Sequence, residues 1–309
     1  DVDSKVIDFS SDEVDPFAVV VATGQTQILD MDGAQGRLLR AGGDIDLSIG
    51  DFVSLSGSVG FERSQQSVTL ADGEQVSTTM LSIGGQNLTG FVGIGPYGTD
   101  SNANGVIDAN EVNSDARGFA VSDVDFALAT FTTDETGTSF NADTQWQAMT
   151  ASVGDVEVML GGIDQFTVDV HSLGLEYNQV DGGSSVIDFS PTAMVAGVEI
   201  DRSLEIVTGG SSTIALTHDG SRGEMLRAML GADISVGGFV QVGGVVSVEK
   251  ASQDMRLANG DVVSTDVLAI GGNKLHGFVG VQGPYLSDTN GDGLTNGDDA
   301  VNSDAVGLM

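Results

Sequence analysis

Two short segments of the sequence combine acidic and amide side chains with a glycine at fixed spacing. In the segment 288–299, oxygen-bearing side chains occupy positions 1, 3, 5, 9 and 12, a glycine occupies position 6, and position 7 offers its backbone carbonyl. These ligand positions hold Asp288, Asn290, Asp292, Leu294, Asn296 and Asp299. Ca²⁺ takes about six to eight oxygen ligands, and a glycine allows the sharp turn that brings them together. The segment therefore predicts a calcium site.

The segment 100–111 repeats this pattern. Its ligand positions hold Asp100, Asn102, Asn104, Val106, Asp108 and Glu111, with Gly105 at the turn. The two segments differ by Asn against Asp at position 5 and by Glu against Asp at position 12. Because amide and carboxylate oxygens both bind calcium, the pattern tolerates these exchanges.

Both segments resemble the calcium loops of EF-hand and dockerin proteins, and Asp299 at position 12 makes the second especially dockerin-like. The resemblance covers twelve residues in each copy. It does not extend to the flanks, since 90–97 and 277–285 have the pattern of strand and turn where an EF-hand has a helix. The resemblance implies a structural Ca²⁺ in a β domain rather than a helix-opening sensor.

Other residues that could bind a ligand or take part in catalysis form less specific patterns. The tetrapeptide Asn-Ser-Asp-Ala follows both loops, at 113–116 and 302–305, and is either a further ligand or a turn. The histidines at 171, 218 and 276 are scattered along the chain, which predicts no shared zinc or catalytic site. Trp146 is expected to anchor a β core rather than stack on a sugar. No nucleophile elbow or phosphate-binding loop is present, so we expect no enzyme.

The elements that must position these loops come from an internal duplication. Shifted by 187 positions, Arg37–Ile94 aligns without a gap on Glu224–Val281, with 27 identities in 58 positions. Further upstream, 6–10 recurs as 186–190. A repeat of this size predicts two domains, 1–180 with loop 100–111 and 181–309 with loop 288–299. Met309 corresponds to about position 120 of copy one, so copy two is incomplete, which indicates a window from a longer array or strands supplied by a neighbouring chain.

The pattern within the repeat is that of β-strands. Residues 53–61 alternate apolar and small polar residues, which predicts a strand with one buried face. Asp72-Gly73 and Asn259-Gly260 lie between apolar runs and predict hairpin turns. We therefore expect an all-β fold of tandem antiparallel β-sandwich-like or elongated β domains, each with an inserted calcium loop.

Composition excludes several classes of function. The chain has 45 acidic and 11 basic residues, for a net charge of -34. Nucleic-acid binding needs a basic surface, and anionic membranes repel such a chain. No apolar run reaches the roughly 18 residues of a membrane span. Cysteine is absent, which excludes disulfides and leaves bound metal as the expected staple.

In overall design the chain is similar to giant tandem-repeat proteins of bacterial surfaces, including RTX-type adhesins and extracellular fibre proteins, although the RTX nonapeptide is absent. That similarity implies a non-catalytic structural segment of a calcium-stabilised extracellular filament or adhesin at the cell surface. Its partners would be neighbouring repeats or copies of itself, head to tail or by strand addition, and glycans or a cell surface. The alternatives are a calcium-dependent carbohydrate-binding, lectin-like module and an accessory region of an enzyme.

Overall fold

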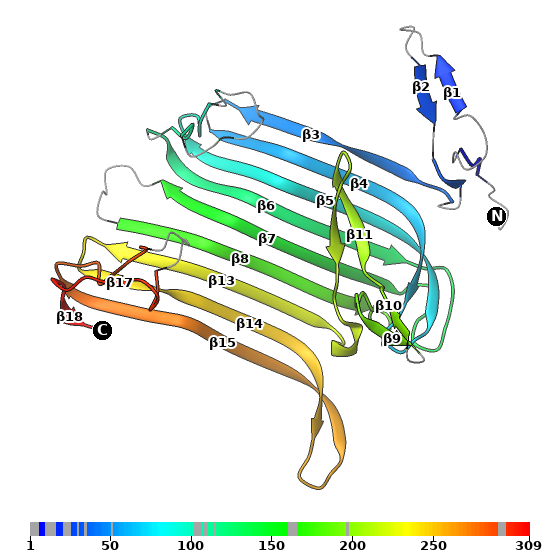
Figure 1. Cartoon of the computed structure of the whole chain (residues 1–309). Helices are drawn as coiled ribbons and strands as arrows, with labels where there is room; N and C mark the ends of the chain where they lie inside the picture. The colour runs from blue at the N-terminus through cyan, green and yellow to red at the C-terminus, as the bar shows by residue number, and fades with distance from the viewer. Residues whose placement is uncertain are drawn as a thin grey trace.

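The computed structural model describes residues 6–9, 17–20, 26–29, 31–33, 36–50, 52–99, 101, 107, 110–113, 115–159, 166–195, 198–289 and 295–309. Ten strands form one antiparallel sheet in the order β18-β15-β14-β13-β8-β7-β6-β5-β4-β3 (Figure 1). They are β3 (Leu39–Ile49), β4 (Val53–Thr69), β5 (Gln75–Ile94), β6 (Arg117–Thr132), β7 (Gln145–Met159), β8 (Phe166–Asp181), β13 (Met225–Val236), β14 (Val240–Arg256), β15 (Val262–Val281) and β18 (Val306–Leu308). The expected all-β fold class is confirmed.

The duplication is visible strand by strand. Shifting the bounds of β4 and β5 by 187 positions gives those of β14 and β15, and β3 corresponds to β13. A β-bulge recurs as well: Gly57 has φ 131° and Gly244 has φ 130°, in a region that disfavours side chains. β8 pairs with β13 through Tyr177 and Leu226, so one sheet runs through both repeats.

Four two-stranded hairpins and one 3-10 turn complete the described structure. The hairpins are β1 (Phe17–Val20) with β2 (Thr26–Leu29), β9 (Ala193–Val195) with β10 (Val198–Ile200), β11 (Leu204–Gly209) with β12 (Ser212–Leu216), and β16 (Leu286–Ser287) with β17 (Ala300–Val301). The 3-10 turn covers Gly220–Arg222. The β11–β12 hairpin lies on one face of the sheet, against β4 and β5 (Figure 1).

The main core lies between this hairpin and the sheet. Trp146 is fully buried, packs edge-on against Phe140 with ring centroids 5.7 Å apart, and donates its indole N–H to the Ser185 carbonyl. Phe131 and Phe189 pack in the same core, with their own ring centroids 6.0 Å apart. The expectation that Trp146 anchors a β core is confirmed.

The face of β4 that the core covers is not the apolar one that the alternation predicted. Gly60, Glu62 and Ser64 are buried, whereas Val59 and Phe61 point the other way and are only half-buried. The reason is the close approach of β11, because a Cβ on Gly60 would lie 2.3 Å from the Val207 carbonyl oxygen. The hairpin therefore requires small residues beneath it, and the prediction of a buried apolar face at 53–61 was wrong.

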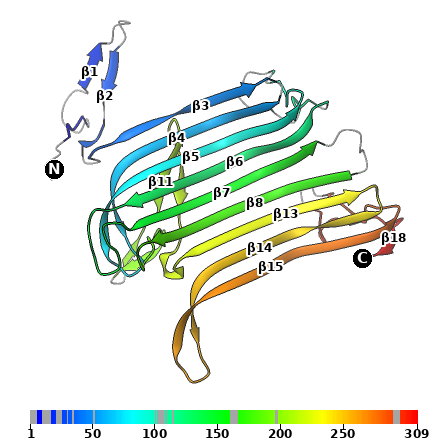
Figure 2. The ribbon, with the colours of Figure 1, turned by 180° about the vertical axis from the view of Figure 1, so that it is seen from behind.

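The opposite face of the sheet carries no second layer within the described residues (Figure 2). It presents apolar side chains to solvent. Ile83 and Leu226 are 42% and 40% exposed, and Leu268 and Ile270 are 66% and 71% exposed. Among the described residues, the larger buried cluster lies under β11–β12, and a smaller one surrounds Phe91 and Tyr97. In the described part of the chain, no helix has the length and apolar character needed to cross a membrane.

Candidate calcium sites

Four of the predicted ligands fall within the described residues: Glu111, Asp288, Asn296 and Asp299. The other eight lie outside them. These are Asp100, Asn102, Asn104, Val106, Asp108, Asn290, Asp292 and Leu294. The structure therefore describes how each loop begins, closes and attaches to the sheet.

Each loop leaves the sheet beside a pair of stacked aromatic rings. Phe91 and Tyr97 stack with centroids 5.6 Å apart in copy one, and Phe278 and Tyr285 stack at 5.9 Å in copy two. Both phenylalanines are almost fully buried. The loop is thus an insertion after β5 or β15, and the expected strand-and-turn flanks are confirmed.

The last residue of each loop turns back onto the start of the loop. Glu111 at position 12 accepts hydrogen bonds from the Ser101 backbone N–H at 2.9 Å and from its hydroxyl at 2.6 Å. Asp299 at position 12 accepts from the Thr289 N–H at 3.1 Å. Ser101 and Thr289 both occupy position 2, so both loops close in the same way, with position 12 bonded to position 2.

The Asn-Ser-Asp-Ala tetrapeptide that follows each loop is a turn. The Asn113 side chain accepts from the Asp115 N–H and donates to the Pro96 carbonyl. Asn302 makes the same two contacts, with Asp304 and Pro284. These Asx turns connect the end of each loop to its start. The tetrapeptide therefore contains a turn, in which the side-chain amide of the asparagine bonds two backbone groups.

The second loop is anchored to the sheet beneath it. Asn296 is 2% exposed, and its backbone N–H donates to the second carboxylate oxygen of Asp299 at 2.8 Å. The Thr295 N–H donates to Asp233 on β13 at 3.4 Å, and Lys274 on β15 pairs with Asp298 at 3.1 Å. The loop therefore depends on strands of its own repeat.

Two histidines meet under this loop, contrary to the expectation of scattered residues. Asp233 lies 3.5 Å from Nδ1 of His171 and 3.3 Å from Nε2 of His276, and all three side chains are nearly buried. The register from β8 through β13 and β14 to β15 brings them together. No local motif links the three residues, so no sequence pattern could have predicted this contact.

The same region concentrates negative charge. Burial raises the pKa of Asp169 on β8; nearby His171 opposes this change, while Asp233 and Asp288 add to it. Asp288 is position 1 of the second loop. Carboxylates thus gather where the loop meets the sheet, and a bound cation would offset their repulsion.

The described donors fit a hard cation in their chemistry. Glu111 and Asp299 supply carboxylate oxygens, the type of ligand that Ca²⁺ takes most often in proteins. Within the described residues, no group of three or more His, Asp or Glu side chains is arranged to hold a metal ion. Coordination would therefore depend on the eight predicted ligands outside the described residues, together with Asp288, Asn296 and the carboxylates at position 12.

Comparison with known proteins yields no relative. No protein-family profile, curated protein or solved structure matches this chain.

Proposed function

We propose that this chain is a structural, non-catalytic segment of a calcium-stabilised extracellular bacterial filament or giant tandem-repeat adhesin. The observation that carries the proposal is the shared closure of the two acidic loops. Glu111 and Asp299 both return to the backbone N–H of position 2, although one loop ends in Glu and the other in Asp. A hydrogen-bonding arrangement retained in both copies with different residues supports a common ligand.

The continuous sheet supports the structural role. Because β8 pairs with the whole of β13, each repeat extends the same sheet as its neighbour. Calcium in the loops would fix the end of β5 or β15 to the strand that follows, and would offset part of the self-repulsion of a chain with net charge -34. Extracellular calcium modules bind at about 10⁻⁴–10⁻³ M, so such sites fill only outside the cytosol.

The test is electron microscopy of the chain in millimolar calcium and after chelation, alongside the double variant Glu111→Gln, Asp299→Asn. We expect ordered rods or filaments in calcium that soften or break up in chelator, and a variant that resembles the chelated protein. Compact particles indifferent to both treatments would contradict the proposal. Calcium-dependent retention on a glycan array by such particles would move the assignment to a lectin-like module.

A further inference from the structure

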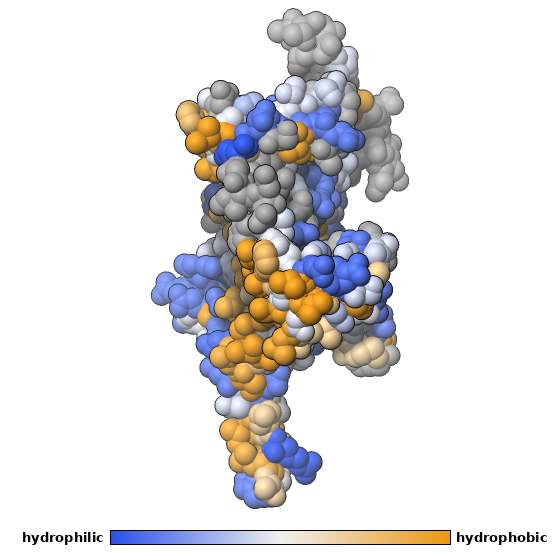
Figure 3. Space-filling model, turned by 90° about the vertical axis from the view of Figure 1, so that its left-hand side faces the viewer, coloured by the Kyte–Doolittle hydropathy of each residue, from blue (hydrophilic) through white to orange (hydrophobic). Residues whose placement is uncertain are grey.

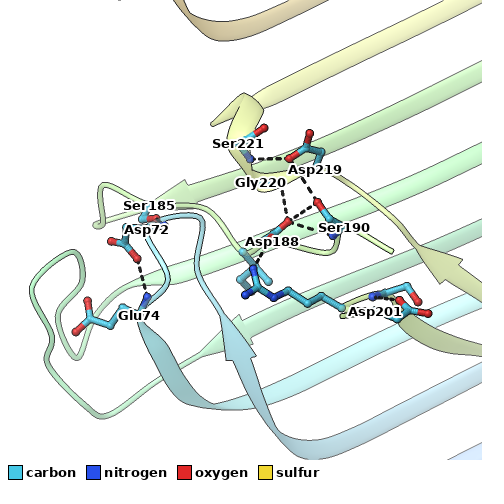
Figure 4. Close-up of polar contacts among 12 residues, drawn as sticks. Asp72, Glu74, Ser185, Asp188, Ser190, Asp201, Asp219, Gly220 and Ser221 are labelled. Carbon is cyan, nitrogen blue, oxygen red and sulfur yellow. Dashed lines mark hydrogen bonds and ion pairs between the residues drawn. The ribbon is translucent and has the colours of Figure 1, made fainter. Parts of the chain in front are cut away.

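The turn between β4 and β5 of copy one pairs with the start of copy two. Leu70 on this turn lies opposite Ile187 in an isolated antiparallel bridge. The Ala71 N–H donates to the Val186 carbonyl and the Asp188 N–H donates to the Thr69 carbonyl, both at 2.9 Å. Figure 4 shows the surroundings of this contact, with Asp72 and Glu74 on the turn and Asp188 held by Ser190 and Gly220. The segment from copy two thus lies as a short strand along the turn of copy one.

Both halves of this contact occur twice in the sequence. The segment Val186–Phe189 recurs without change as Val6–Phe9, and the turn Leu70–Gly73 recurs as Leu257–Gly260 with a single exchange of Asp for Asn. Only one half from each pair meets its counterpart in this chain. The remaining two halves are Val6–Phe9 and the Leu257–Gly260 turn.

These remaining halves already have the conformation of the paired ones. The Phe9 N–H donates to the Met31 carbonyl at 2.9 Å, as the Phe189 N–H does to the His218 carbonyl. The Gly33 N–H donates to the Asp8 carboxylate as the Gly220 N–H does to that of Asp188.

The turns match in the same way. The Leu257 N–H donates to the Asp261 carbonyl at 2.8 Å, the distance of the Leu70 bond to Glu74. Neither half needs to refold before contact.

Exposure distinguishes the halves that meet in this chain from their counterparts. Ile187 is 1% exposed and its counterpart Ile7 is 70% exposed, while Leu70 is 0% and Leu257 is 47% exposed. The two counterparts lie at opposite ends of the sheet, with β1–β2 beyond β3 and the β14–β15 turn projecting past the far edge (Figure 1). Figure 3 shows apolar side chains running down the C-terminal strands onto this projection. Val6–Phe9 and the Leu257–Gly260 turn therefore do not contact each other in this structure.

We infer that Val6–Phe9 of a second copy of this chain docks along the Leu257–Gly260 turn, in the pairing seen between Ile187 and Leu70. Ile7 would cover Leu257, the Ala258 N–H would donate to the Val6 carbonyl, and the Asp8 N–H to the Arg256 carbonyl. The inference deepens the proposed filament function and rests on it. Because the two surfaces differ, the contact is heterologous and can repeat head to tail from one chain to the next.

Charge favours this pairing. Arg256 occupies the position of Thr69 and would stand directly opposite Asp8, an opposite-charge pair across strands. The β1–β2 hairpin of the docking chain would not pack as closely as β11–β12 does. At the positions of Gly42 and Gly60, copy two has Met229 and Ser247, so a hairpin over copy two must lie farther from the sheet. The contact is therefore carried by the turn and the Val6–Phe9 segment.

The absence of cysteine allows a direct test by crosslinking. The bonds that flank Leu70 and Ile187 make them a non-hydrogen-bonded pair, with Cα atoms about 4.5 Å apart in such pairs. That spacing lies within the disulfide range of about 4.4–6.8 Å. Leu70→Cys with Ile187→Cys in one chain is the positive reference, and should form an intramolecular disulfide on mild oxidation.

The test mixes chains carrying Ile7→Cys with chains carrying Leu257→Cys, in calcium and in chelator. We expect a covalent dimer from the mixture, and at least tenfold less from Ile7→Cys mixed with Met194→Cys, whose site is 67% exposed. Dimers in both conditions support the contact even if calcium has no structural role. Equal yields for the two mixtures, or no dimer while rods remain visible by microscopy, overturn the contact and leave the filament proposal standing.

Charge substitutions give an independent measurement by sedimentation velocity. Leu257→Asp should return the chain to monomer at concentrations where the parent associates. Leu268→Asp is the matched control, because Leu268 lies on β15, faces the other side of the sheet and is more exposed at 66%. Equal loss of association in both variants would contradict the proposed pairing.

Discussion

Leu70 of copy one lies opposite Ile187 of copy two, and the two residues are 0% and 1% exposed. Their contact fixes the β4–β5 turn to the start of copy two. It also gives a reference for the same turn in copy two, where Leu257 is 47% exposed.

Leu70→Ala should therefore lower the free energy of unfolding far more than Leu257→Ala. Removing a fully buried leucine costs about 2–5 kcal/mol, from lost burial and from the cavity left behind. The exposed counterpart should change stability by less than about 0.5 kcal/mol. Urea unfolding at a concentration where the chain is monomeric measures both. Equal losses would show that the two turns are buried alike in solution.

The glycines beneath β11 make a second matched pair. Gly60→Ala places a Cβ 2.3 Å from the Val207 carbonyl oxygen, so the hairpin must shift. We expect a loss of about 1–3 kcal/mol, the usual cost of overpacking. Gly43→Ala on β3 meets nothing within 4 Å and should be neutral or slightly stabilising. Thermal unfolding of the two variants measures the difference. Similar unfolding temperatures would contradict the close packing of β11 on Gly60.

Much of the strand layout could be predicted from the sequence because it is local and repeated. The hairpin signals at Asp72-Gly73 and Asn259-Gly260 both mark turns in the structure. The alternation at 53–61 correctly predicted a strand. It did not predict which face is covered, because that depends on β11, a segment about 150 residues farther along the chain.

The candidate sites, too, could be predicted only in part from the sequence. The ligand spacing of the loops is local, and the closure by Glu111 and Asp299 follows from it. The contact of His171 and His276 with Asp233 depends on the register of four strands, which no short-range pattern encodes. The anchoring of Thr295 to Asp233 has the same origin.

Calcium should stabilise the chain through Asp299 but not through its neighbour Asp298. If a loop binds at about 10⁻⁴ M, then 1 mM calcium adds about 1.4 kcal/mol to the free energy of unfolding for that site. Asp299→Asn should remove most of this increment. Asp298→Asn makes the same change of charge at a residue that is exposed and paired with Lys274, and should keep it. Calcium titration followed by differential scanning calorimetry distinguishes them, and equal increments would remove Asp299 from the site.

Acidification should weaken the fold through His218. This side chain is 6% exposed and packs edge-on against Phe189, with ring centroids 6.3 Å apart. Burial lowers its pKa; nearby Glu176 and the Met149 backbone act to raise it, and Arg227 acts to lower it.

Because the folded state favours the neutral imidazole, unfolding takes up a proton below the ordinary pKa of about 6.5. The free energy of unfolding should then fall as the pH drops below about 6.5. His218→Leu should flatten the profile between pH 6.5 and 5, since leucine fills the apolar site without titrating. Urea unfolding across this range measures the slope, and an unchanged slope in the variant would show that His218 is not the source of the dependence.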